Sequence, residues 1–331
     1  MSSTSEDPTA GVRLGWWLSS EEHDPRALVQ HTVIAEQAGL TTAMISDHLQ
    51  PWVPTQGNSP HVWTTIGAIA QATDAIEVGT GVSAMVGRNS PITIAQAAAT
   101  AAVLLEGRFF LGVGTGERLN EQPFGDRWPS VSERRQHMCE AIEIVRALLR
   151  GDQVDHRGER WTVQSLQLAT RPAQPPPIYV ASSGKQTAKA AGEVGDGMIA
   201  VTPDNELVDG FRGSGGEGKP CLAQVHISLA ATVDEARENA WRWWPHGVVP
   251  PALLGELSRP KEFEAAAIAI GPQAISETVV CTSDSAAIIA AIDEFVGAGF
   301  GHVYIHQIGS DQQRLADACA AELLPHYRNG R

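Results

Sequence analysis

The chain has very little lysine, and this scarcity limits what it can bind. Lysine occurs only at Lys185, Lys189, Lys219 and Lys261 among 331 residues, and the formal net charge at pH 7 is −14. A surface of this sign repels nucleic acid and anionic membranes, because both carry dense negative charge. We therefore expect a small-molecule substrate, with no nucleic-acid partner and no membrane partner.

Cysteine is also scarce, and its spacing argues against disulfides and zinc. The four cysteines lie far apart without a CxxC pair, at Cys139, Cys221, Cys281 and Cys319. This pattern is typical of reduced core residues in a cytoplasmic protein. The motif HExxH is absent and the histidines show no ligand spacing, so we expect no metal site.

Long apolar segments and secretion signals are missing as well. No apolar run approaches the roughly 20 residues that span a bilayer. Residues 1–11 are polar, with neither a cationic start nor an apolar stretch, so we expect a flexible N-terminus and no signal peptide. Hydrophobic residues make up 43% of the chain, enough for one large core in residues 12–331.

Strand and helix signals alternate along the chain, which favours an α/β fold with a parallel sheet. Eight strands are predicted, at 12–17, 42–45, 76–82, 109–113, 178–181, 197–201, 221–231 and 302–308. This number favours a TIM (β/α)8 barrel over an open sheet. We expect a hairpin insertion near 152–168, a lid-like insertion near 245–272, and a mobile glycine-rich segment at 204–220.

One strand is followed by glycines and polar groups, in the sequence FFLGVGTGERLNE at 109–121. The glycines permit a tight turn or a close approach to a ligand. Thr115, Glu117 and Asn120 then lie at the carboxyl end of the strand, where TIM barrels place their chemistry. A dinucleotide fingerprint is disfavoured, because Glu117 occupies the position of its third glycine. A plain turn with a solvated Glu117 stays open as an alternative.

A second strand ends in the same way, in the sequence AMISDHLQPW at 43–52. Asp47 and His48 could be a helix cap followed by a surface histidine. However, a histidine just beyond a buried strand is well placed for proton transfer. Trp52, four residues later, can supply a flat apolar wall beside such a site.

These motifs resemble those of the deazaflavin (coenzyme F420) oxidoreductases of the luciferase-like superfamily, most closely the F420-dependent glucose-6-phosphate dehydrogenase group. The likeness is carried by SDHLQPW at 46–52, FLGVGTGERLNE at 110–121 and PIYVASSG at 177–184, with weaker support from GDG at 195–197 and HVYIHQ at 302–307. The resemblance implies a luciferase-like barrel that binds coenzyme F420 at its C-terminal mouth, and a homodimer. It also implies hydride transfer from a hydroxyl-bearing carbon to C5 of the deazaflavin.

The resemblance also implies roles for individual residues. His48 matches the histidine that exchanges a proton with the substrate hydroxyl, and Glu117 matches the carboxyl group proposed to exchange one with N1 of the cofactor. Trp52 matches the tryptophan beside the reacting carbon, and Glu21 matches a further active-site glutamate. The positions that match cofactor contacts are Asp47, Thr115, Gly116 and Asn120, the backbone of Ser183 and Gly184 with Lys185 nearby, and a cis peptide at Gly81–Val82.

The match fails where the glucose-6-phosphate enzymes hold the substrate phosphate. Their two lysines and one arginine correspond here to Asp204, Ala265 and Thr278, and Asp204 would repel a phosphate. The segment near 245–272 and its approach instead offer aromatic residues, which are either a pocket wall or ordinary core: Trp241, Trp243, Trp244 and His246. We therefore expect an alcohol or sugar substrate without a phosphate.

Three other functions remain open from sequence. The chain could be an FMN-dependent monooxygenase on the same barrel, or an F420H2-dependent reductase that runs the reaction in reverse. It could also be a binding protein or inactive paralogue that holds the cofactor without turnover. His302 and His306, on the last predicted strand, are interpreted as core and rim residues.

Overall fold

Eight parallel strands close into a barrel in the computed structural model, which describes residues 11–329. The barrel strands are β1 (Arg13–Leu18), β2 (Thr42–Ile45), β3 (Glu77–Thr80), β5 (Phe109–Gly114), β8 (Ile178–Ala181), β9 (Gly197–Ala200), β10 (Cys221–Leu229) and β12 (His302–Gln307). β10 pairs with both β9 and β12, which closes the ring. The predicted TIM barrel is confirmed, whereas most of the N-terminal stretch predicted to be flexible lies outside the described residues.

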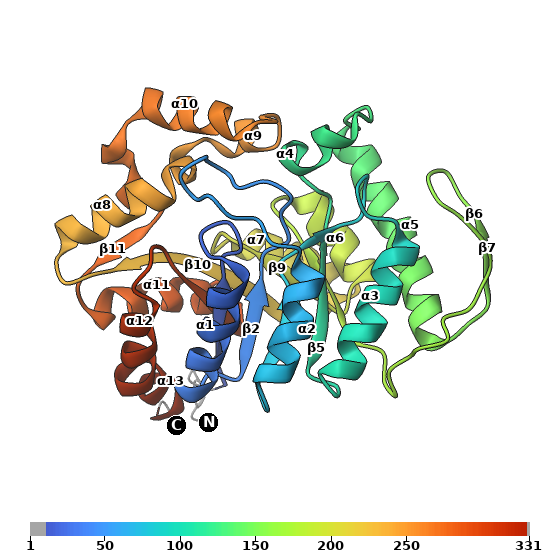
Figure 1. Ribbon diagram of the computed structural model, residues 1–331, viewed down its shortest axis with the longest axis horizontal. Helices are drawn as coiled ribbons and strands as arrows, with labels where there is room; N and C mark the ends of the chain where they lie inside the picture. Colours follow the sequence, from blue (N-terminus) through green and yellow to red (C-terminus); the bar gives the residue numbers. More distant parts are fainter. Residues whose placement is uncertain (1–10, 330–331) are drawn as a thin grey trace, which may run out of the picture.

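Helices cover the outside of the barrel (Figure 1). They are α1 (Pro25–Gln37), α2 (Val62–Ala72), α3 (Pro91–Leu104), α5 (Val131–Arg150), α6 (Lys185–Val194), α11 (Ser285–Gly297) and a C-terminal series of α12 (Gln312–Ala318), η5 (Cys319–Leu323) and α13 (Leu324–Asn329). Several begin at a residue whose side chain accepts hydrogen bonds from the first turn, as Asp24, Ser90, Ser130 and Asp284 do. None of the described helices has the length and apolar character needed to span a bilayer.

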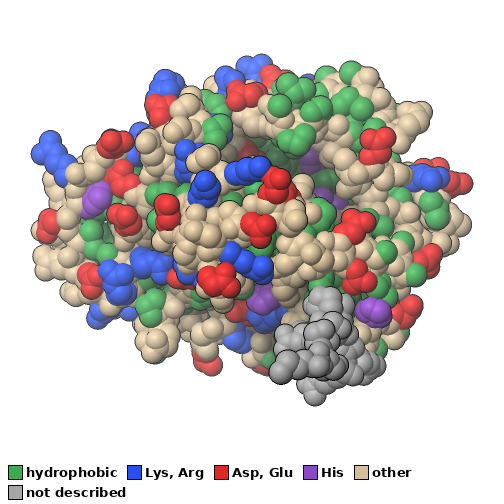
Figure 2. All heavy atoms as spheres, turned by 180° about the vertical axis from the view of Figure 1, so that it is seen from behind, with side chains coloured by type: hydrophobic (Ala, Val, Ile, Leu, Met, Phe, Trp, Pro, Cys, Tyr) green, Lys and Arg blue, Asp and Glu red, His purple; other side chains and the backbone are tan. Residues whose placement is uncertain are grey.

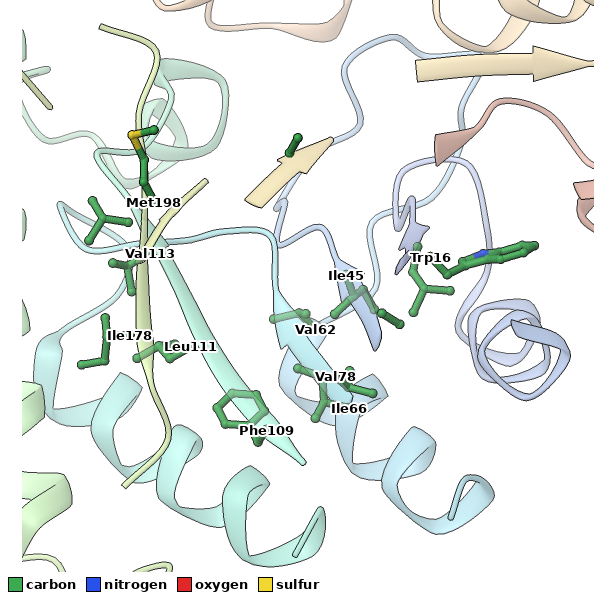
Figure 3. Close-up of a cluster of buried hydrophobic side chains, with 14 of the residues drawn as sticks. Trp16, Ile45, Val62, Ile66, Val78, Phe109, Leu111, Val113, Ile178 and Met198 are labelled. Atoms are coloured by element: carbon green, nitrogen blue, oxygen red, sulfur yellow. The ribbon is translucent and has the colours of Figure 1, made fainter. Parts of the chain in front are cut away.

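The core consists of two layers, one outside the barrel wall and one inside it. Figure 3 shows part of the outer layer, where strand residues such as Val78 and Phe109 meet helix residues such as Ile66. The inner layer is a plug of side chains that point into the barrel, formed by Trp17, Met44, Phe110, Ile199, Leu222 and Tyr304. The plug fills the barrel, so a ligand site is confined to the mouth above it.

Gly112 illustrates how tightly the wall is packed. A Cβ added there would lie 1.9 Å from the carbonyl oxygen of Thr80 on the neighbouring strand. We expect Gly112→Ala to lower the free energy of unfolding by about 3 kcal/mol or more, because backbone must move to admit the methyl group. Gly67→Ala on α2, where nothing lies within 4 Å of the added Cβ, is the matched control. Urea denaturation of both variants measures the difference, and equal stability would contradict this account.

The structure corrects one sequence prediction and adds elements that were not predicted. The segment at 204–220, expected to be mobile, forms α7 (Asn205–Phe211) and η2 (Arg212–Gly216), which pack against α6. Asp204 caps α7 by accepting a hydrogen bond from the Glu206 amide at 2.8 Å. The third predicted strand is interrupted by the cis peptide at Gly81–Val82 and continues as β4 (Ser83–Ala84). β11 (Val280–Thr282) and the long helix α5 had no counterpart in the sequence prediction.

Two further segments depart from the simple βα repeat. β6 (Val154–Arg157) and β7 (Thr162–Leu166) form an antiparallel hairpin away from the barrel, visible at the right of Figure 1. A second group follows the carboxyl ends of the strands: α4 (Arg118–Glu121), α8 (Val233–Trp243), η3 (Pro245–Val248), α9 (Pro251–Leu254), α10 (Pro260–Ile270) and η4 (Pro272–Glu277). Of these, α4, α9 and α10 are at the top of Figure 1. This group contributes side chains to the mouth.

Candidate active site

Three polar side chains converge on one point at the mouth of the barrel. His48 follows β2, Glu21 follows β1 and Glu117 follows β5. His48 Nε2 lies 3.6 Å from Glu21 Oε1 and 3.6 Å from Glu117 Oε2. Both carboxylate oxygens are buried and have no hydrogen-bond partner among the described residues. The cluster is therefore arranged to receive an oxygen atom of a ligand.

The other carboxylate oxygen of Glu21 explains why this charge is held in place. Glu21 Oε2 accepts hydrogen bonds from Ser19 Oγ at 3.0 Å and Ser46 Oγ at 2.8 Å, so Oε1 is left to face His48. Burial raises the pKa of Glu117, an effect that the nearby His48 opposes. A Glu117 that holds its proton more readily than a solvated glutamate can act as a hydrogen-bond donor.

Asn120 sets the proton position on His48. Asn120 Oδ1 accepts from the backbone amides of Leu49 at 2.8 Å and Gln50 at 3.3 Å, which fixes the orientation of the side-chain amide. Its Nδ2 then donates to His48 Nδ1 at 3.1 Å. Because Nδ1 is an acceptor, a neutral His48 carries its proton on Nε2, toward the two carboxylates. The sequence linked Asn120 to the cofactor and did not predict this contact.

Asp47 lies in a buried ion network rather than free at the mouth. Its Oδ2 accepts from Ser83 Oγ at 2.6 Å, and its Oδ1 accepts from an Arg88 guanidinium nitrogen at 2.8 Å. The backbone amide of Arg88 donates to Glu121 Oε2 at 2.6 Å. Glu121 belongs to the 110–121 motif, but sequence reasoning assigned neither Glu121 nor Arg88 a role. The network joins the segments that follow β2, β4 and β5, which all border the site.

An aromatic wall extends from the His48 cluster. The ring centroids of Trp52 and His48 lie 4.8 Å apart, and His246 stacks on Trp52 at 4.9 Å with a 10° interplanar angle. Phe263 from α10 meets Trp52 edge-on at 5.3 Å, and Trp244 lies 4.3 Å from His246. Figure 2 shows a hollow in the rear face that contains hydrophobic and histidine side chains. Of the four aromatic residues considered from sequence, Trp244 and His246 reach this wall.

The other residues expected to contact the cofactor follow β3, β5 and β8. The Gly81–Val82 peptide is cis, as the resemblance implied. Gly116 follows β5 with a φ of 74°, next to Thr115, and Gly184 precedes the first residue of α6 with Ser183 beside it. Lys185 forms an ion pair with Glu206 of α7. The roles of these residues in binding stay predictions.

The charges near α6 and α7 are unfavourable for a phosphate group on the substrate. Asp204 caps α7, and Glu206 already neutralises Lys185. Ala265 lies in α10, and Thr278 follows η4 with its hydroxyl donating to the Ile275 carbonyl. None of these three aligned positions carries a cation. Within residues 11–329, no group of three or more His, Cys, Asp or Glu side chains is placed to hold a metal ion.

Comparison with known proteins agrees with this architecture. The family model for luciferase-like monooxygenases matches residues 10–302. The chain belongs to this family. It is 33% identical to an F420-dependent glucose-6-phosphate dehydrogenase of Segniliparus rotundus, over 96% of this chain and 98% of that protein. A match of this length extends well beyond the short motifs that carry the resemblance.

Two solved structures have the same fold. An F420-dependent secondary alcohol dehydrogenase, solved with an F420–acetone adduct, superposes with a TM-score of 0.86 at 27% identity, over 92% of this chain and 96% of that one. The F420-dependent tetrahydromethanopterin reductase of Methanopyrus kandleri gives a TM-score of 0.78 at 20% identity, over 96% and 100%. The second likeness concerns the fold alone.

Proposed function

We propose that this luciferase-like protein is a coenzyme F420-dependent dehydrogenase that oxidises a hydroxyl-bearing carbon. The observation that carries the proposal is the convergence of His48 Nε2, Glu21 Oε1 and Glu117 Oε2 on one point, with two of these atoms buried and unpartnered. Curated relatives and a structural neighbour bear F420-dependent dehydrogenase names, which supports the same assignment. We also propose a cytoplasmic homodimer.

The residues present fit a deazaflavin. Thr115, Gly116 and Val82 would border its ring system, while the amides of Ser183 and Gly184 at the start of α6 would hold its phosphate. Glu117, whose Oε2 is buried without a partner among the described residues, would exchange a proton with the deazaflavin. When bound, the deazaflavin supplies the hydride acceptor of the reaction.

His48 and Glu21 divide the work on the substrate oxygen. Since Asn120 donates to Nδ1, His48 presents an N–H at Nε2 that can donate to the substrate oxygen. Glu21 Oε1 is an acceptor on the other side of the same point and can take the hydroxyl proton as the hydride departs. The resemblance predicts His48 as the proton acceptor. For Nε2 to accept a proton, the neutral ring would have to carry its proton on Nδ1, so the Asn120 amide that donates to Nδ1 would first have to turn away. Trp52 and His246 exclude water from one side.

The donor state of His48 also favours a second candidate, the reverse reaction. A histidine N–H at Nε2 can donate a hydrogen bond to a carbonyl oxygen without any prior rearrangement, and a protonated Glu21 would return the proton to that oxygen as the hydride arrives. A ketone reductase that uses reduced F420 is therefore the alternative. The rate of alcohol oxidation with F420 and the rate of ketone reduction with reduced F420, measured at one pH, distinguish the dehydrogenase from the reductase.

We propose further that the substrate carries no phosphate. Asp204 caps α7 and Glu206 pairs with Lys185, so this side of the mouth offers carboxylates where a phosphate would need cations. The aromatic wall of Trp52, His246 and Trp244 suits an uncharged molecule. Glucose 6-phosphate turnover at about 1 per second or more would contradict this part of the proposal.

A binding titration tests the cofactor. Purified protein is titrated with oxidised F420 and, separately, with FMN, and we expect tight binding of F420 and weak binding of FMN. A panel of secondary alcohols and unphosphorylated sugars is then assayed for F420 reduction. A preference for FMN would replace the proposal with a monooxygenase, whereas F420 binding without any turnover would point to a binding protein.

A further inference from the structure

A chain of three side chains lies beneath the mouth, apart from the His48 cluster. Glu22 Oε1 lies 2.8 Å from His306 Nε2, and His306 Nδ1 lies 3.0 Å from His226 Nδ1. Glu22 and His306 are fully buried, whereas His226 keeps solvent-accessible surface. The Nε2 of His226 has no hydrogen-bond partner among the described residues. The chain therefore ends in a ring nitrogen that is open to the mouth.

The open end adjoins the aromatic wall of the proposed active site. His226 is on the inward face of β10, two inward positions nearer the mouth than the plug residue Leu222. The ring of Trp244 lies 5.1 Å from His226 and 4.3 Å from His246, which stacks on Trp52. Three ring contacts thus connect Trp52 with His226. The two acid–base groups, His48 and His226, border different parts of one aromatic wall.

Other polar atoms near the open end also lack partners. Ser228 is on the same inward face of β10 as His226, and its Oγ is buried without a hydrogen bond among the described residues. Both ring nitrogens of His246 also lack a hydrogen-bond partner among the described residues, and only 3% of this residue is exposed. Buried polar atoms without partners are costly, and a polar group of a ligand would satisfy them.

The connectivity of the chain permits two proton arrangements. When Glu22 is a carboxylate, His306 donates from Nε2 to Glu22 and His226 donates from Nδ1 to His306, so His226 Nε2 is an acceptor. When Glu22 is protonated, it donates to His306 Nε2, His306 donates from Nδ1 to His226, and His226 Nε2 carries a proton. One proton taken up at His226 Nε2 thus comes to rest on Glu22 after two shifts along hydrogen bonds.

We propose that Glu22, His306 and His226 form a proton relay whose open end binds a second oxygen of the substrate, apart from the reacting hydroxyl. The inference rests on the proposed function and specifies its substrate class: an uncharged alcohol with a second hydroxyl or carbonyl oxygen. A hydroxyl can donate to His226 Nε2 or accept from it. A carbonyl can only accept, so it binds the form in which Glu22 is protonated.

Glu22 is the member of the relay that changes charge near neutral pH. Burial, opposed by the neighbouring His23, raises the pKa of Glu22 to about 7. Burial lowers the pKa of His226 and of His306 to about 3, so both rings stay neutral. The other titratable groups that face the relay are Glu21 and His23 from its own loop, His31 from α1 behind His23, and His246 from η3.

The tautomer of His226 can be read directly, without cofactor or substrate. In protein labelled with ¹⁵N-histidine, we expect the His226 Nε2 resonance to change from N–H-bearing to lone-pair-bearing as pH rises through about 7. In Glu22→Gln, the amide oxygen replaces the oxygen that accepts from the Gly309 amide at 2.8 Å, so the amide nitrogen donates to His306. This variant should keep Nε2 protonated at every pH. A tautomer that does not respond to pH or to this variant would overturn the relay.

Three six-carbon alcohols test the second oxygen in the F420-loaded enzyme: hexan-2-ol, hexane-2,5-diol and 5-hydroxyhexan-2-one. We expect KM for the diol and the hydroxyketone to be about tenfold below that of hexan-2-ol, the effect of one buried hydrogen bond. KM for the hydroxyketone should rise above pH 7 in the natural protein and stay constant in Glu22→Gln. His226→Phe should remove this preference, so that KM no longer differs between hexan-2-ol and the other two substrates.

The controls separate failure of the relay from failure of the fold or of the proposed function. His302→Gln changes a histidine at the opposite end of β12 and should keep the substrate preference. If His226→Phe does not fold, His226→Gln retains a polar side chain without a titratable ring, and should keep the diol but lose the pH response. Turnover that ignores the second oxygen would refute the relay alone. Absence of F420 binding would refute the proposed function, and the tautomer measurement would still decide the relay.

Discussion

Replacing His48 with alanine should lower kcat at least about 100-fold while F420 binding is retained. The imidazole is the only side chain in the cluster that offers an N–H to the substrate oxygen, since the oxygens facing it belong to the carboxyl groups of Glu21 and Glu117. Without it, the alkoxide-like oxygen that forms as the hydride departs loses its N–H donor. Stopped-flow absorbance of F420 reduction measures the effect.

The matched control for this substitution is His61→Ala. His61 is exposed at the start of α2, where its Nδ1 lies 2.9 Å from Thr64 Oγ1, and it has no contact with the site. We expect its kcat to stay within about twofold of the natural value, as is usual for surface changes. His48→Gln tests whether the ring acts only as a hydrogen-bond donor, because glutamine can donate a hydrogen bond but cannot exchange a proton. Turnover retained in His48→Ala would remove His48 from the mechanism.

The protein should lose stability steeply as pH falls from 6.5 toward 4. Burial lowers the pKa of His23, His31 and His302 from 6.5 to about 4, so the folded state binds fewer protons than the unfolded state in this window. Their stabilisation is complete above pH 6.5 and is lost as pH falls through the folded values. At 1.36 kcal/mol per pKa unit, each costs on the order of 3 kcal/mol.

Glu22 acts in the opposite direction over part of this range. Its pKa is raised to about 7, so its contribution to stability is greatest below pH 4.5 and is lost as pH rises to 7. The three histidines outweigh Glu22, so the net effect of these four groups is a loss of stability in acid. Urea midpoints measured between pH 4 and 7.5 test this, and His31→Gln should flatten the curve. A flat curve in the natural protein would show that these histidines are hydrated.

The sequence was sufficient for the barrel because each strand is a short apolar run that ends at glycine or a polar residue. The same logic located His48 and Glu117, since carboxyl ends of parallel strands meet at one mouth, whereas Glu21 came from the family resemblance. The role of Arg88 was not predicted, because no motif surrounds this arginine in the sequence after β4. Only the folded structure places its guanidinium beside Asp47.

The relay could not be predicted for a different reason. Glu22 and His306 are 284 residues apart, and His226 and His306 are 80 apart, so no local spacing connects them. Their contact depends on β10, β12 and β1 lying side by side with a particular register, in which His226 is level with His306. His306 was interpreted as a core or rim residue. It is fully buried, but it also carries hydrogen bonds on both ring nitrogens.

The network of Asp47, Arg88 and Glu121 has a consequence for how this protein can change over evolutionary time. Arg88 faces two carboxylates that are themselves buried, at 5% and 6% side-chain exposure. Loss of any one member leaves an uncompensated charge in the interior, so substitutions at the three positions are strongly epistatic. The loops that carry His48 and Glu117 are thereby constrained as a set. Changes in substrate preference during evolution would accordingly occur in the aromatic wall, because replacing one of its side chains with another uncharged one leaves no buried charge without a partner.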